Sequence, residues 1–200
     1  MRLPEEVVIR GRLLSEILSY HRNWRCNARS IRKERAILCA ADLSDVDLRG
    51  ADLSYADLSY AFLCGADLHG ATVYGTCWHE ANLYGAENVP YIPMTCPEEG
   101  SFIGWKKSRD NSIIKLRIPE DAKRSSACGR KCRCDKAEVL SIETWDGRQL
   151  RYAESYYSYS FKYEVGKTVY VDYFEDDRWI ECAPGIHFFI NRQEAVDYIF

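Results

Sequence analysis

The residues of this chain best suited to chemistry are nine cysteines and four histidines, and some of them are closely spaced. A structural zinc site needs four nitrogen or sulfur ligands in a tetrahedral array. The candidate ligands are Cys96, Cys128, Cys132, Cys134, Cys182 and His187. The CxxC knuckle of the usual zinc sites is absent from this group. We therefore expect packed or unpaired thiols, with no metal and no cofactor.

A second candidate is a nucleophile, because Cys182 and His187 stand five residues apart in ECAPGIHFF. A thiolate beside an imidazole is the minimum for nucleophilic catalysis, and the Pro-Gly turn between them could bring the two together. The sequence assigns neither an orienting acid nor an oxyanion donor. The alternative is a turn leading into a buried strand, with His187 hydrogen-bonded at its edge. We predict a protein that is not an enzyme, and a thiol- or zinc-dependent protein using Cys132, Cys182 and His187 stays an alternative.

A basic segment, RIPEDAKRSSACGRKCR, could bind a phosphate or another anion. The candidate side chains are Lys123, Arg124, Arg130, Lys131 and Arg133. The alternative is a solvated loop whose cations pair with Glu120, Asp121 and Asp135. Walker spacing is absent, so a nucleotide-binding loop is not indicated.

Tyrosines are concentrated in RYAESYYSYSFKYEVGKTVYVDY. Tyr157, Tyr159, Phe161 and Tyr163 alternate, which predicts a strand with one aromatic face. If that face is exposed, Tyr157, Tyr159 and Tyr163 would bind a partner protein, because tyrosine supplies a large contact area at low entropic cost. If it is buried, the same residues form core.

The elements that must position these residues differ between the two halves of the chain. Residues 36–90 repeat every five positions, as in ADLSY ADLSY AFLCG ADLHG. Neither a helix nor a strand keeps every fifth residue on one face, so the period predicts a repeat architecture. The apolar residue in the middle of each block should form the repeat core. These residues are Leu43, Leu48, Leu53, Leu58, Leu63, Leu68, Val73, Trp78 and Leu83.

This segment resembles the pentapeptide-repeat family, whose pattern is A(D/N)LXX. The resemblance implies a right-handed quadrilateral β-helix with one pentapeptide on each side and the leucines stacked inside. About ten blocks make two and a half coils, which rise only about 12 Å at the spacing of paired strands. So short a solenoid needs caps at its ends.

Aspartates directly precede the central leucine in many blocks, so the repeat is acidic while the N-terminal segment is basic. Some members of the pentapeptide-repeat family inhibit DNA gyrase by imitating duplex DNA, which makes an acidic DNA mimic an alternative function. The other interpretation is that each Asp binds the backbone at a corner of the repeat. A rise of about 12 Å is short beside the ~34 Å turn of DNA, which argues against mimicry.

Four segments follow from these patterns. Residues 1–35 form an N-terminal cap with a helix at about 12–25, whose apolar face includes Leu14, His21 and Trp24. Residues 36–90 form the repeat, and prolines mark a linker at 91–95. Residues 96–200 form an α+β domain of short strands, with a helix start at Asn191 and Glu194. We predict a mainly β protein.

The C-terminal segment carries a second resemblance, in GSFIGWKK, LRIPEDAKRSSACGRKCR, YEVGKTVYVDYF and ECAPGIHFFINRQEA. These motifs are similar to those of an uncharacterised domain that follows pentapeptide repeats in phage and bacterial proteins, and they imply no activity.

The expected function is that of a non-enzymatic protein–protein interaction module, of the phage type that modulates a host protein. Its partner would be another protein, and a second copy of the chain is a further candidate. No membrane partner and no direct nucleic-acid partner is expected. Without a signal peptide or an apolar span, the expected compartment is the cytoplasm.

Overall fold

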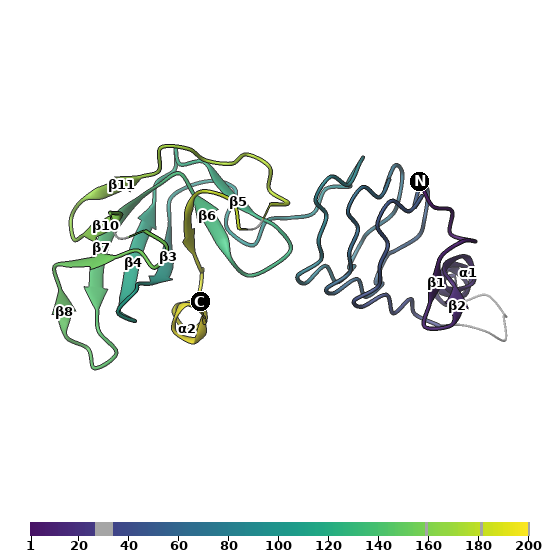
Figure 1. The fold of residues 1–200 in the computed structure, drawn as a ribbon, viewed down its shortest axis with the longest axis horizontal. Helices are drawn as coiled ribbons and strands as arrows, with labels where there is room; N and C mark the ends of the chain where they lie inside the picture. Colours follow the sequence, from purple (N-terminus) through teal and green to yellow (C-terminus); the bar gives the residue numbers. More distant parts are fainter. Residues whose placement is uncertain (27–33, 159, 181, 200) are drawn as a thin grey trace. The chain divides into compact units, whose positions relative to one another are not determined.

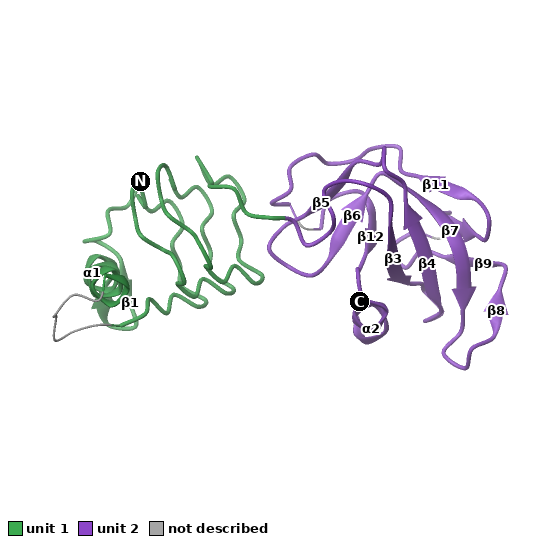
Figure 2. Cartoon of the chain, turned by 180° about the vertical axis from the view of Figure 1, so that it is seen from behind, with its two compact units in different colours: residues 1–93 green, residues 94–200 purple. Residues whose placement is uncertain are grey.

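The computed structural model describes residues 1–26, 34–158, 160–180 and 182–199. The chain forms two compact units, Met1–Pro93 and Met94–Phe200, and the boundary between them in the sequence falls within the predicted linker (Figure 2). Most of the regular structure is β, and the described residues contain two helices. Neither of these two helices has the length and hydropathy of a membrane span.

Parallel pairings twenty residues apart organise the repeat in the first unit. Ile37 pairs with Asp57, Asp52 pairs with Thr72, and the series continues to the pair of Asp67 with Glu87. The chain therefore returns to the same edge after four pentapeptides, and successive coils follow one another in Figure 1. Each pairing involves a single residue on each side, so none of these sides extends into a longer strand.

A turn after each central residue explains why the repeat has a period of five. The amide of Ala41 donates to the carbonyl of Leu38 at 3.0 Å, and Ala51 donates to Leu48 at 3.0 Å. The residue before the donor has a positive φ, for example 65° at Gly50. This is the geometry of a type II turn, which favours glycine at its third position. Each block is thus one short extended side followed by one corner.

The central residues of the blocks form the core of this unit. Leu43, Leu48, Leu53, Leu58, Leu63, Leu68 and Leu83 are all 0% exposed. Trp78 is also buried, whereas Val73 is half-buried.

The N-terminal residues cover one edge of the coils. A short hairpin of β1 (Val8–Ile9) and β2 (Arg12–Leu13) leads into α1 (Leu14–Arg25). Buried His21 of α1 accepts a hydrogen bond from the amide of Ala36 at 3.1 Å on Nδ1, so its Nε2–H donates to the carbonyl of Ser54 at 2.9 Å. At the equivalent position one pentapeptide later, the carbonyl of Ser59 accepts a hydrogen bond from a backbone amide instead. The helix therefore supplies the donor that a preceding coil would have provided.

The second unit is built from antiparallel sheets. The larger sheet contains β3 (Phe102–Lys107), β4 (Ile113–Ile118), β7 (Lys136–Glu143), β8 (Gln149–Leu150) and β11 (Thr168–Tyr170). A smaller sheet contains β5 (Arg124–Ser126), β6 (Cys132–Cys134) and β12 (Ile186–Phe188). The remaining elements are the hairpin of β9 (Tyr152–Glu154) and β10 (Lys162–Glu164), and α2 (Arg192–Asp197).

Side chains between the sheets form the core of the second unit. Ile114, Leu116, Ile118, Val139, Ile142 and Phe188 are all 0% exposed. Gly104 of β3 faces Phe188 so closely that an added Cβ would lie 2.7 Å from the ring. A backbone bridge between Trp105 and Phe189 joins β3 to the residues after β12. These contacts hold β3 against β12, which positions the site described below.

The predicted aromatic strand through residues 157–163 is wrong. The first strand of that hairpin ends at Glu154 and the second begins at Lys162, with Tyr163 paired to Ala153. Because the two strands pair antiparallel, Tyr157 belongs to the connection between them rather than to a strand. Tyr159 lies outside the described residues.

Candidate functional site

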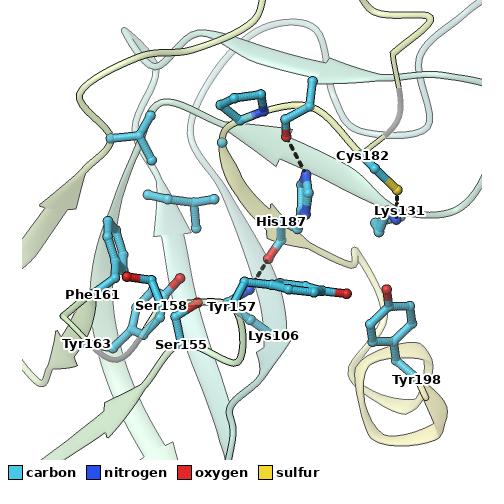
Figure 3. A pocket seen from close by; sticks show the side chains of 15 residues that line it. Lys106, Lys131, Ser155, Tyr157, Ser158, Phe161, Tyr163, Cys182, His187 and Tyr198 are labelled. Atoms are coloured by element: carbon cyan, nitrogen blue, oxygen red, sulfur yellow. Dashed lines mark hydrogen bonds between the residues drawn. The ribbon is translucent and has the colours of Figure 1, made fainter. Parts of the chain in front are cut away.

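The second unit contains a cavity of about 410 Å³, within the range of small-molecule sites (Figure 3). Its lining comes from distant parts of the chain: strand β3, the loop after β9, strand β10, the segment Ala183–His187, and the end of α2. Lysine and tyrosine side chains from these elements meet there, as Figure 3 shows for Lys106, Tyr157 and Tyr198.

Apolar side chains form one wall of the cavity. Phe161, Tyr163, Val171 and Ile186 line it, and the rings of Phe161 and Tyr163 lie 5.3 Å apart. Tyr163 is only 1% exposed, and burial raises its pKa. The prediction that Tyr163 belongs to an exposed partner surface is therefore wrong, because β10 turns this side chain inward. Tyr157 is 72% exposed.

Lys106 is the least expected group in the cavity. It is half-buried on β3, and its Nζ donates a hydrogen bond to the carbonyl of His187 at 3.2 Å. The same Nζ lies 5.8 Å from the centre of the Tyr163 ring. Across the described residues, no carboxylate forms an ion pair with it. Burial lowers the pKa of Lys106 to about 8.

Lys131 brings a second cation to the cavity. Its Nζ donates to Cys182 Sγ at 3.4 Å and lies 5.9 Å from the centre of the Tyr198 ring. Burial raises the pKa of the Tyr198 hydroxyl. Tyr157 and Tyr198 approach each other in Figure 3. Lys131 is the only one of the five predicted anion-binding residues that lines this cavity.

Cys182 and His187 both line the cavity, but their hydrogen bonds lead elsewhere. The His187 ring nitrogen Nε2 lies 3.0 Å from the Ala183 carbonyl, so a neutral imidazole donates its Nε2–H there. Burial, followed by the charges of Lys106 and Lys131, lowers the pKa of His187 to about 4. Cys182 is therefore hydrogen-bonded to Lys131, and His187 is hydrogen-bonded to the backbone. The structure does not assemble the thiolate–imidazole pair considered above, and the interpretation of His187 as a hydrogen-bonded strand-edge residue fits this geometry.

The cysteines of β6 are packed thiols. Cys132 and Cys134 are buried and lie 3.7 Å from the carbonyl oxygens of Arg130 and Ile186, respectively. A hydrogen bond with Cys96, together with burial, raises the pKa of Cys132, and burial raises that of Cys134. Cys128, which precedes β6 in the sequence, is half-buried. In the described ranges, no group of three or more His, Cys, Asp or Glu side chains could hold a metal ion.

Two of the predicted anion-binding residues form ion pairs with distant acids. Lys123 pairs with Asp176 at 3.1 Å, and Arg130 pairs with Glu194 at 2.6 Å. Neither acid is among the neighbouring residues that the sequence offered as partners. Both pairs are surface contacts, and both draw their cation away from a shared site.

Two further arginines are held by backbone carbonyls. Arg124 donates to the carbonyls of Pro119 at 2.8 Å and Gly100 at 2.7 Å. Arg133 is only 2% exposed and donates to the carbonyl of Glu175. The prediction of one anion-binding loop at Lys123–Arg133 is therefore wrong, because folding distributes these side chains among different acceptors.

The aspartates of the repeat bind the backbone at its corners. Each accepts the amide hydrogen of the second residue after it, at 2.9–3.1 Å. They are Asp42, Asp47, Asp52, Asp57 and Asp67. Hydrogen bonds from Arg49 lower the pKa of Asp47 to about 2. These aspartates therefore have a structural role in the turns of the repeat.

Large aromatic residues are exposed on the repeat, and we call them the aromatic belt. The belt consists of Tyr55, Tyr60, Phe62, Tyr74 and Tyr84, which are between 43% and 74% exposed. The pairings Asp52–Thr72, Asp57–Cys77 and Phe62–Asn82 assign them to three neighbouring sides of the coils. Tyr55 and Tyr74 contact edge to face, with ring centres 5.4 Å apart.

Sequence reasoning missed Lys106, Tyr198 and the belt. Lys106 follows an apolar stretch of β3, and only the register of that strand places it on the side that faces β12. The belt residues occupy the outward positions of their blocks, so the repeat pattern itself could have identified them as exposed.

Comparisons with known proteins agree with the division of the chain. The model of a "Family of unknown function (DUF5758)" matches residues 92–195, just over half of the chain. The model "Pentapeptide repeats (8 copies)" matches residues 34–70 and 47–85. Neither the curated proteins nor the solved structures contain a match. The chain therefore belongs to the family of unknown function DUF5758, with pentapeptide repeats preceding the family domain.

Proposed function

We propose that this chain is a non-enzymatic interaction protein that docks onto a partner protein through the aromatic belt. Pentapeptide repeats are generally protein-interaction modules. In this proposal the repeat is a right-handed quadrilateral solenoid capped by α1. The cytoplasm is the proposed compartment, which the nine free thiols support. The resemblance to phage proteins favours a host protein as the partner.

The observation that carries this proposal is the backbone conformation of the belt tyrosines at the corners. Tyr55 and Tyr60 have φ values of 63° and 59°, a conformation for which half of the corners of the same repeat use glycine. A bulky residue in this conformation costs about 1–2 kcal/mol. Burial does not offset this cost at Tyr60, which is 51% exposed. Exposed aromatic side chains that the backbone disfavours are typical of a binding surface.

Affinity capture with the purified full chain tests this function. A belt variant combines Tyr60→Gly, Tyr74→Ser and Tyr84→Ser, and a matched control carries Tyr152→Ser and Tyr170→Ser, which are equally exposed in the second unit. We expect the wild type and the control to retain the same protein from extracts of the native cell. The belt variant should lose it, and the purified partner should reproduce this difference.

The belt variant should also remain folded, since glycine adopts a positive φ without strain. Equal retention of the purified partner by the belt variant would contradict the proposal. Light scattering on the purified chain identifies the case in which the partner is a second copy, because the belt substitutions would then convert a dimer into a monomer.

A further inference from the structure

We propose that the cavity of the second unit binds a small carboxylate with an apolar, planar body. This inference goes beyond the proposed function, since the cavity and the aromatic belt lie in different units. Two lysines and one histidine line the cavity, and none of its described lining residues is an aspartate or a glutamate. An anion would supply the charge that this lining lacks.

Lys106 provides the strongest argument for an anion. An ammonium group has three donors, and one of the Lys106 donors is used by the His187 carbonyl. The group contacts a buried aromatic ring and forms no ion pair with a described carboxylate. A cation removed from water without a counter-ion is unfavourable, and a bound carboxylate would relieve this cost. The depressed pKa of Lys106 agrees with this position.

The groups beside Lys106 also favour a negatively charged ligand. Lys131 lies on the lining beside Cys182 and Tyr198. His187 stays neutral at physiological pH, and its Nε2–H is already donated to Ala183, so the lysines determine the charge of the cavity. A lysine ammonium group binds an anion as a point charge.

The shape of the lining indicates the body of the ligand. Phe161, Tyr163, Val171 and Ile186 offer an apolar surface, and two aromatic rings among them can stack on a planar group. Tyr157 and Tyr198 also line the cavity, and Figure 3 shows the ring of Tyr157 pointing toward Tyr198. No described lining residue is an arginine, so the fork that binds carboxylates and phosphates bidentately is absent from this lining. A phosphate monoester carries nearly two negative charges and a carboxylate carries one, so a carboxylate costs less to remove from water among these apolar side chains.

Calorimetric titration of the full chain with matched probes tests the inference. The probes are 3-phenylpropionate, its neutral amide and phenyl phosphate. We expect the carboxylate to bind at least tenfold more tightly than the amide and more tightly than the phosphate. Lys106→Met should weaken carboxylate binding at least tenfold, while Lys167→Met, outside the cavity, should leave it unchanged. The belt variant should bind like the wild type, so failure here is distinguishable from failure of the proposed function.

A second measurement avoids any dependence on the folding of a variant. Binding of an anion to Lys106 should raise the pKa of its ammonium group, so the wild type should take up protons on binding at pH 8 and take up almost none at pH 6.5. Titration in two buffers of different ionisation enthalpy measures this uptake. Absence of carboxylate binding, equal affinity for the amide, tighter binding of the phosphate, or equal proton uptake at both pH values would each overturn the proposal.

Discussion

At the scale of single residues, the most informative groups are those whose charge is constrained by their surroundings. His21 and His187 each use a ring nitrogen on a backbone carbonyl, and burial lowers the pKa of both. Both imidazole rings are therefore neutral at neutral pH. Lys106 differs, because its pKa of about 8 leaves it mostly protonated in a half-buried position. Polar groups held in this way commonly mark a binding site.

The cost of Lys106 leads to a stability prediction. The pKa of Lys106 is about 8 in the folded chain and 10.5 when unperturbed. Burying the charged ammonium group therefore destabilises the folded state fully below pH 8 and not at all above about pH 10.5. Lys106→Met removes this cost. We expect the variant to be more stable than the wild type at pH 7, by at most about 3 kcal/mol. Loss of the donor to His187 reduces this gain by about 1 kcal/mol.

Urea denaturation of both proteins at pH 7 and pH 10 measures this effect. The advantage of Lys106→Met should shrink as the pH rises from 8 to 10.5. Lys167→Met, on the surface, should change stability by no more than about 0.5 kcal/mol at either pH. A variant that is less stable than the wild type at both pH values would show that Lys106 has a structural role.

At the scale of elements, the repeat is defined by its corners as much as by its leucines. Every described corner combines a positive φ with a hydrogen bond from the next block, and an Asp or Asn side chain often accepts a second amide. Asn82 performs this role with Tyr84 at 3.0 Å, as Asp52 does with Ser54 at 3.1 Å. The element therefore needs an oxygen acceptor at this position and does not need a negative charge.

This reasoning predicts the result of removing the charges. A triple variant with Asp42→Asn, Asp52→Asn and Asp57→Asn should fold and melt close to the wild type at pH 7, because the amide oxygen still accepts the backbone hydrogen. The corresponding triple alanine variant should lose about 1 kcal/mol for each missing hydrogen bond. Circular dichroism during heating measures both.

The same variants should differ in their response to acid. Hydrogen bonds from Ser44 and Ser59 lower the pKa of Asp42 and Asp57 in the folded state, so their contribution is present above the ordinary carboxyl pKa and is lost as the pH falls through the lowered values. The triple Asn variant should therefore lose less stability than the wild type on acidification. Unfolding of this variant at pH 7 would show that the repeat requires the charge itself.

At the scale of the whole molecule, each unit has its own core. The leucine column lies entirely within Met1–Pro93, and the sheets of the second unit pack on one another within Met94–Phe200. A domain with its own core can fold alone. This arrangement assigns the two proposals to different units, with the aromatic belt in the first and the cavity in the second.

We therefore expect residues 94–200 to fold as a separate fragment. Its amide spectrum should overlay the corresponding signals of the full chain away from the boundary, and the fragment should unfold cooperatively. Nuclear magnetic resonance with amide hydrogen exchange measures both. A fragment without protected amides in β4 and β7 would show that the second unit depends on the repeat.

The sequence anticipated much of the fold but little of the cavity. β3, β4 and β12 lie in the segment where the sequence predicts short strands, and the helix start at Asn191 forms the expected capping box. These are local patterns of alternation and capping. The aromatic segment misled the same reasoning, because alternation between Tyr157 and Tyr163 is also compatible with a loop followed by a short strand. The register of β9 with β10 decides between the two.

By itself, the sequence determined the repeat, because a repeat depends on a fixed period. It offered two roles for the aspartates, and the hydrogen bonds at the folded corners show the backbone-binding role. Tertiary structure alone decided the ion pairs of Lys123 and Arg130, the burial of Tyr163, and the meeting of Lys106 with Lys131 and His187. These contacts join residues far apart in the chain, and their geometry depends on strand order and register. The type of a residue states what chemistry it can perform, whereas its charge and accessibility are determined by neighbours that only the folded chain supplies.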